Sequence, residues 1–135
     1  MNRAPAAVAA VFAASVTIAC SQPSEPAACS ARLVVSVNEG AALTFSWSPG
    51  DCGAVDLSVS EAGSAIKWLV QSASASNALL PPVAYGQVPA GAFSATPPET
   101  LLPGITYHVG MSRRRADGSE FLAGESDFVV SRSWP

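Results

Sequence analysis

Apolar and polar residues alternate along much of the chain from Arg32 onward. In the segment 42–48, Leu43, Phe45 and Trp47 alternate with hydroxyl-bearing side chains. Because successive side chains of a strand point to opposite faces, this period of two places the apolar residues on one buried face. The same alternation predicts strands over residues 32–37, 55–60 and 66–70.

Short segments rich in turn-forming residues separate these strands, at 38–40, 49–53 and 62–64. Near the end of the chain, a strand over 105–113 is expected to turn at Asp117-Gly118 and to return through Phe121 to Val130. Asp-Gly between two such runs is typical of a hairpin. Residues 71–100 are rich in proline, which cannot donate to a strand ladder, so we expect a proline-broken edge or a long loop there.

About seven short strands with regular turns predict an all-β fold, built as an antiparallel sandwich of two sheets. No segment beyond the N-terminal leader has a convincing helical stripe. The 135 residues suffice for one domain once a targeting segment is removed.

The chain has few charged residues and a slightly negative net charge. Charged residues make up 13% of the sequence, about half of the usual share, and the formal net charge is -3. A generally basic surface that would bind nucleic acid is therefore not expected.

The first residues have the pattern of an export signal. A positively charged start with Arg3 precedes an apolar run over 4–19 that consists mostly of Ala and Val. This run is shorter than the roughly 20 residues that a membrane-spanning helix needs, so a permanent span is the weaker alternative. We expect a helical signal segment over residues 1–19.

The end of this run, Val16-Thr17-Ile18-Ala19-Cys20, resembles the lipobox of bacterial lipoproteins. The resemblance implies diacylglycerol transfer to the Cys20 thiol, cleavage before that residue and acylation of the new amine. Several buried acyl chains anchor a protein stably, because each buried CH₂ adds about 0.8 kcal/mol. The alternative is an ordinary cleaved signal near Ala19 with Cys20 incidental.

The residues after the lipobox suggest how the protein would be placed in the envelope. By resemblance to Gram-negative lipoproteins, Ser21 favours forwarding to the outer membrane. The polar, proline-bearing stretch that follows has nothing to bury, and we expect residues 20–30 to form a lipid-anchored tether.

Assignment of Cys20 to lipid leaves Cys29 and Cys52 as a matched pair in a compartment that permits disulfides. Cys29 precedes the first predicted strand and Cys52 follows the second, so antiparallel pairing places both at the same end of the sandwich. We predict a disulfide between them. The alternative is a metal site, for which two thiols without CxxC spacing and a single histidine are poor ligands, and we expect neither metal nor cofactor.

Two segments resemble the fibronectin type III family of immunoglobulin-like sandwiches. Leu102-Pro103-Gly104-Ile105-Thr106-Tyr107 is similar to the family signature before the penultimate strand, and Leu43-Thr44-Phe45-Ser46-Trp47 is similar to its second strand. The resemblance covers residues 31–131 and leaves 132–135 as a short tail. It implies that Tyr107 forms a tyrosine corner, with its hydroxyl bonded to upstream backbone.

One motif resembles that of an enzyme family. Ser64-Ala65-Ile66-Lys67 fits the SxxK pattern of penicillin-recognising enzymes, but it lies in a predicted strand and lacks a KTG partner. We interpret it as an exposed turn serine followed by a strand lysine, and we assign no catalytic residue.

His108 is the single histidine of the chain, and alternation directs it away from the buried side of Tyr107. The acids Asp51, Asp56 and Glu61 lack the dense spacing of a calcium loop, and we interpret them as solvated charges.

The densest cationic feature is Arg113-Arg114-Arg115, just before the hairpin tip. It is a candidate contact patch for anionic sugars, lipid headgroups or an acidic partner. The alternative is a strand end whose charge is partly balanced by Asp117 and Glu120.

These features favour a non-enzymatic, lipid-anchored module that binds or assembles an envelope component. Its expected partners are the membrane, through the lipid on Cys20, and an unidentified envelope protein or glycan; nucleic acid is not expected. The alternative is a small hydrolase of envelope polymers, which would need acids or a nucleophile beside His108 in a cleft.

Overall fold

The computed structural model describes residues 27–135 of the chain. The predicted signal segment 1–19, Cys20 and the first part of the tether lie outside these residues. The elements in chain order are a short 3-10 helix and eight strands: η1 (Ala27–Ser30), β1 (Val34–Glu39), β2 (Leu43–Ser48), β3 (Asp56–Glu61), β4 (Ile66–Ser72), β5 (Val83–Ala84), β6 (Ala92–Thr96), β7 (Thr106–Arg114) and β8 (Glu120–Val129).

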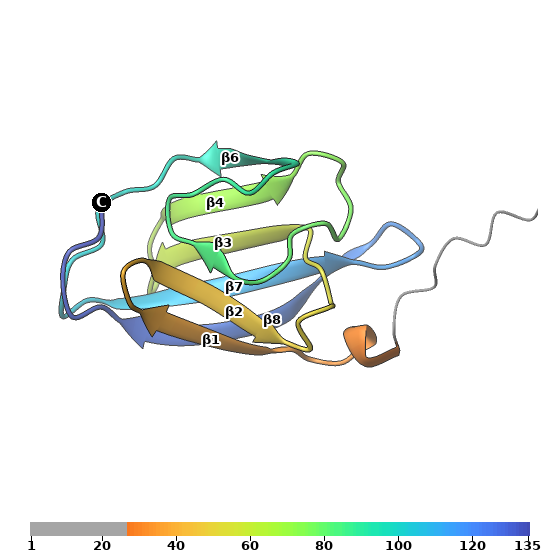
Figure 1. Cartoon of the computed structure of the whole chain (residues 1–135), viewed down its shortest axis with the longest axis horizontal. Coiled ribbons are helices and arrows are strands. Elements are labelled where there is room, and N and C mark those ends of the chain that lie inside the picture. The colour runs from red at the N-terminus through yellow and green to blue at the C-terminus, as the bar shows by residue number, and fades with distance from the viewer. Residues whose placement is uncertain (1–26) are drawn as a thin grey trace, which may run out of the picture.

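The strands form two sheets that pack as a sandwich (Figure 1). One sheet has three strands in the order β1-β2-β5, and the other has five in the order β6-β4-β3-β7-β8. All the strand pairings within them are antiparallel. The predicted all-β fold with two antiparallel sheets is thereby confirmed.

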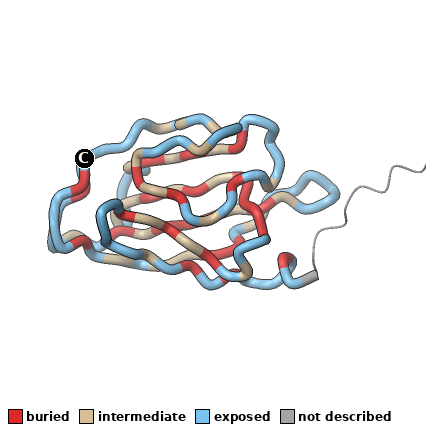
Figure 2. Tube along the Cα trace, viewed as in Figure 1, coloured by how far each residue is buried: buried red, intermediate tan, exposed pale blue. Residues whose placement is uncertain are grey.

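The core forms where the alternating apolar residues of both sheets meet. Figure 2 shows buried and less buried positions following one another along the central strands. Phe45 of β2 connects the two layers, because its ring lies 6.5 Å from that of Trp68 in β4 and 5.6 Å from that of Phe128 in β8. Aromatic contacts of this kind add to the stability that burial provides.

The first hairpin turns later than the sequence predicts. Asn38 and Glu39 belong to β1, where they pair with Thr44 and Leu43. The predicted turn over 38–40 is therefore wrong in its first two positions. Strand pairing continues through these two polar residues, and the chain reverses after Glu39.

The proline-rich middle of the chain supplies two edge strands. β5 joins the three-stranded sheet beside β2, and β6 joins the five-stranded sheet beside β4. β5 follows Pro82 directly, as expected of a proline-broken edge. β6 was not predicted, because its alternation places a phenylalanine, Phe93, on the exposed side.

The two ends of the described chain lie at opposite ends of the molecule (Figure 1). Residues 132–135, predicted as a short tail, are packed onto the domain: Trp134 pairs with Leu101 through backbone hydrogen bonds and is buried. Within residues 27–135, no helix is long and apolar enough to span a membrane.

Candidate functional site

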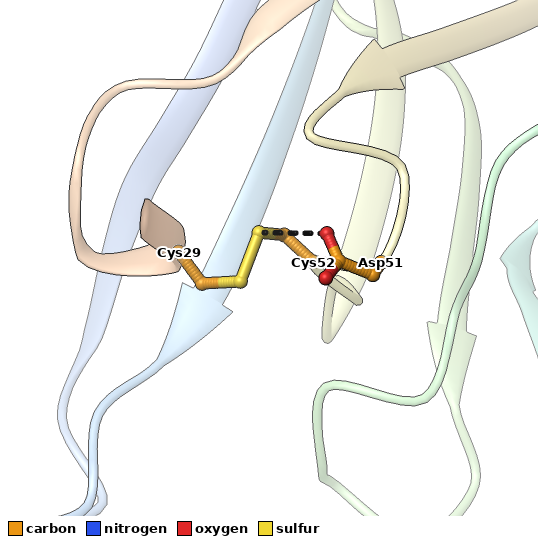
Figure 3. A group of neighbouring side chains, drawn as sticks. All are labelled: Cys29, Asp51 and Cys52. Atoms are coloured by element: carbon orange, nitrogen blue, oxygen red, sulfur yellow. Dashed lines mark hydrogen bonds between the residues drawn. A yellow bond between two sulfur atoms is a disulfide. The ribbon is translucent and has the colours of Figure 1, made fainter. Parts of the chain in front are cut away.

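A disulfide closes the end of the sandwich at which the described chain begins. As predicted, Cys29 of η1 is bonded to Cys52 in the loop after β2, with the Cα atoms 5.3 Å apart (Figure 3). Asp51 lies beside the pair, with a carboxylate oxygen 3.9 Å from the Cys52 sulfur. These three residues are the right types for a metal site, but sulfurs joined in a disulfide are not the thiolates that metal ligation requires.

Arg113 is buried next to the residues of this disulfide and does not lie at the surface. Its side chain is buried, its Nε donates to the Gly53 carbonyl at 2.6 Å, and its Nη1 donates to the Cys29 carbonyl. Burial lowers the pKa of the Arg113 guanidinium. The arginine therefore holds η1 and the loop after β2 against β7.

The predicted three-arginine contact patch is corrected by this placement, because alternation along β7 turns Arg113 inward. Arg114 points to the other face and forms an ion pair with Glu120. The guanidinium of Arg115 lies 4.2 Å from the centre of the Phe121 ring. The alternative interpretation, a strand end balanced by nearby acids, describes Arg114 correctly.

Other contacts at this end were not predicted from the sequence. The Trp47 indole donates to the Cys52 carbonyl at 2.6 Å. The Asn77 side chain makes two hydrogen bonds to the Arg114 backbone, of 2.8 and 2.7 Å. A Cβ on Gly53 would lie 1.9 Å from the Asn77 carbonyl oxygen, so only glycine allows this loop to approach so closely.

Tyr107 lies near the start of β7, and its ring is buried. Its hydroxyl oxygen accepts a hydrogen bond of 2.9 Å from the Leu102 amide, five residues upstream. The contact fixes the chain where it enters the strand, and it is the geometry that a tyrosine corner requires.

His108 lies on the outer face of the five-stranded sheet within a network of charges. Its Nδ1 is 2.7 Å from an Asp127 oxygen and its Nε2 is 3.3 Å from a Glu125 oxygen. Glu125 also pairs with Arg32 at 2.5 Å. Both imidazole nitrogens therefore face carboxylates of β8.

Lys67 of the SxxK motif is also engaged. Its ammonium lies 2.9 Å from Glu99 and 3.8 Å from Glu61, whereas Ser64 lies in the turn before β4. The hydrogen bond to Glu99 is the main cause of a raised Lys67 pKa, opposed by a smaller effect of burial. The ammonium that the motif would need beside its serine is therefore paired with two carboxylates.

The three acids interpreted as solvated charges differ in their surroundings. Asp51 is exposed, while Glu61 is half-buried near Lys67. Asp56 departs from the prediction: burial raises its pKa, and hydrogen bonds from Ser112 oppose this effect only in part.

One hollow of about 290 Å³ lies at the end of the sandwich opposite η1. The aromatic residues in its wall already have partners for their polar atoms. Tyr85 donates its hydroxyl to the Glu99 carbonyl at 2.5 Å, and the Trp134 indole donates to Glu39 at 3.0 Å. Burial raises the pKa of Tyr85 to about 12. The lining residues are Ala41, Ala42, Leu43, Ala84, Tyr85, Gly86, Gln87, Pro98, Trp134 and Pro135.

A second hollow, of about 280 Å³, opens beside the outer face of the five-stranded sheet. It combines an exposed aromatic ring with an amide and an ion pair, so it presents both an apolar surface and hydrogen-bonding groups. Its lining residues are Val55, Gln71, Ser72, Ala73, Ala75, Phe93, Arg114 and Glu120.

Comparison of the chain with protein-family models, with curated proteins and with solved structures found no match.

Proposed function

We propose that this protein is an exported, lipid-anchored module of the cell envelope that binds an envelope protein or glycan and has no catalytic activity. The lipobox-like segment ending at Cys20 supports the anchor, and Ser21 supports an outer-membrane location. The polar stretch up to residue 30 would then separate the domain from the membrane.

The observation that carries this proposal is the way in which the domain is secured at its tethered end. Cys29, nine residues after Cys20, is bonded to Cys52, and its carbonyl accepts a hydrogen bond from buried Arg113. A force applied along the tether would therefore be transmitted through Cys29 to the core of the sandwich before it reached β1. Such reinforcement suits a domain that is held to a surface while it engages a partner.

The proposed fold type is that of a fibronectin type III-like sandwich. Tyr107, near the start of the penultimate strand, bonds to backbone five residues upstream, and Trp47 of the second strand is in the core. β6 is an additional edge strand beyond the seven expected.

The hydrolase alternative receives less support. Acids do lie beside His108, as it requires, but they occupy both ring nitrogens, and Lys67 is bonded to Glu99. Neither residue lines one of the two hollows described above.

Fractionation of cells that express the full chain tests the proposal. We expect the wild type in the membrane fraction and Cys20→Ala in the soluble exported fraction. Equal membrane retention of both would show that the lipid on Cys20 is not the anchor.

A digestion assay tests the absence of catalysis. Purified wild type and His108→Ala should both leave isolated envelope polymers intact. Release of fragments by the wild type and not by His108→Ala would overturn the non-enzymatic assignment in favour of a hydrolase.

A further inference from the structure

A row of side chains crosses the five-stranded sheet next to the second hollow. Strand register places Phe93 opposite Gln71, Gln71 opposite Asp56, Asp56 opposite Ser112, and Ser112 opposite Leu122. Residues in register across neighbouring strands lie on the same face of a sheet. The row therefore runs from an aromatic ring through an amide, a carboxylate and a hydroxyl to a second apolar side chain.

Phe93 gives this face an accessible aromatic surface. It is 47% exposed, although most large apolar side chains of the described chain are buried in the core. Its position on the edge strand β6 leaves its outer side open, and Gln71 stands beside it on β4. An exposed ring next to an amide can contact a ligand that has both apolar and polar sides.

An ion pair also lines the hollow. Arg114 and Glu120 are bonded to each other, and their side chains remain 35% and 44% exposed. A guanidinium has five donors and a carboxylate can accept several hydrogen bonds, so the pair retains free capacity for a ligand. The mutual contact also holds both long side chains in place before binding, which lowers the entropy lost on association.

We propose that this hollow binds one ring of a neutral saccharide, with the ring stacked on Phe93 and its hydroxyls bonded to Gln71 and the Arg114–Glu120 pair. A sugar ring presents C–H groups on its faces and hydroxyls around its rim, which matches an aromatic surface bordered by donors and acceptors. The inference rests on the proposed function, since it names the chemical class of the envelope partner.

The volume of the hollow agrees with a ligand of this size. At about 280 Å³, it lies just below the range of roughly 300–1,000 Å³ in which pockets bury drug-sized ligands. This volume suits a single ring better than a longer glycan.

Local charge disfavours anionic ligands. Glu120 and Arg114 line the hollow, and a second carboxylate, Asp56, lies in the row beside Gln71. A phosphate, a nucleotide or an acidic sugar would be repelled by this surplus of negative charge. A neutral hydroxyl-rich ring would not.

The hollow at the far end of the sandwich is less suited to a sugar. Tyr85 and Trp134 in its wall are only 8% and 9% exposed, and their polar atoms bond to other parts of the chain. The aromatic rings of that hollow are therefore buried, whereas the Phe93 ring is accessible to a ligand.

Titration of the full chain followed by NMR tests the proposal. The ¹⁵N-labelled protein, held in a sugar-free detergent, is titrated separately with cellotetraose, maltotetraose, chitotetraose and inorganic phosphate. We expect at least one tetrasaccharide to cause saturable shifts of the amides of Gln71, Phe93 and Arg114. Phe93→Ala should weaken this binding about tenfold, and Phe93→Trp should preserve it.

A matched control is Leu80→Ala, which shortens an exposed apolar side chain that does not line the hollow. This variant should bind as the wild type does. The proposal is overturned if no tetrasaccharide causes saturable shifts, if Phe93→Ala binds unchanged, or if phosphate shifts the same amides more strongly than every sugar. Loss of membrane retention by the wild type would instead defeat the proposed anchor, whatever the titration shows.

Discussion

The buried guanidinium of Arg113 donates a hydrogen bond to the carbonyl oxygen of Cys29, a residue 84 positions earlier in the chain. Cys29 is at the same time covalently bonded to Cys52. A second donor of Arg113 reaches the carbonyl of Gly53, the next residue after Cys52. One arginine thus satisfies backbone acceptors on both sides of the disulfide, and it does so inside the protein, where an unsatisfied carbonyl is costly.

Replacement of this arginine should therefore weaken the fold. Arg113→Met keeps much of the side-chain volume but removes every donor, and we expect the free energy of unfolding to fall by about 2–4 kcal/mol. The matched control is Arg115→Met, which loses a cation–π contact with Phe121 and should cost no more than about 1 kcal/mol. Urea unfolding measures both, and equal losses would contradict the structural role of Arg113.

Removal of the disulfide should act on the unfolded chain as well as on the folded end of the sandwich. We expect the double variant Cys29→Ser, Cys52→Ser to lose about 3 kcal/mol of unfolding free energy, because the bond closes a loop between positions 23 apart. Cys20→Ser, which leaves the bond intact, serves as the control and should unfold at the wild-type urea concentration. The same midpoint for the double variant would show that the bond does not constrain the fold.

The two core tryptophans should respond differently to loss of the indole N–H. Trp47 donates to the Cys52 carbonyl, whereas the Nε1 of Trp68 is buried with no hydrogen-bond partner among the described residues. We expect Trp47→Phe to destabilise the protein by about 1–3 kcal/mol more than Trp68→Phe does, although Trp68 is the more deeply buried. Thermal unfolding of the two variants decides this, and a larger loss for Trp68→Phe would contradict it.

Asp56 should make stability depend on pH. Burial raises the pKa of Asp56 in the folded state, so folding favours the neutral carboxyl group. The stability that the neutral group contributes is fully present below the unfolded pKa of about 3.9 and is lost as pH rises through the higher folded pKa. We therefore expect Asp56→Asn to be more stable than the wild type at about pH 7 and to lose this advantage below about pH 4.

The control for this effect is Asp51→Asn, which changes an exposed acid in a nearby loop. Unfolding free energies of the three proteins are compared across the acid range. A difference between Asp56→Asn and the wild type that stays constant with pH would mean that titration of Asp56 is not its cause.

The strands that the sequence predicts well are those whose alternation is governed by burial on one face. Leu43, Phe45 and Trp47 of β2 are of this kind, and all three are buried. β6 follows no such rule, because its one large apolar side chain, Phe93, points to the exposed side. An edge strand that buries few apolar side chains has only a weak alternation of apolar and polar residues in its sequence.

The placement of Arg113 could not be deduced from local sequence. Three consecutive arginines indicate an exposed basic segment, and the carbonyls that accept from Arg113 belong to residues 60 and 84 positions away. The second hollow has no sequence signal for a similar reason, since its walls come from the residue before β3, from β4 and the loop after it, from β6 and from the β7–β8 hairpin. Such sites depend on tertiary contacts and have no motif of their own.

The anchor on Cys20 is the central claim, and acyl labelling tests it most directly. Cells that express the wild type or Cys20→Ala are grown with a palmitate analogue, and the label on each purified protein is measured. We predict strong labelling of the wild type and none of Cys20→Ala. Equal labelling of the two proteins, or no label on either, would contradict the claim that Cys20 carries the lipid.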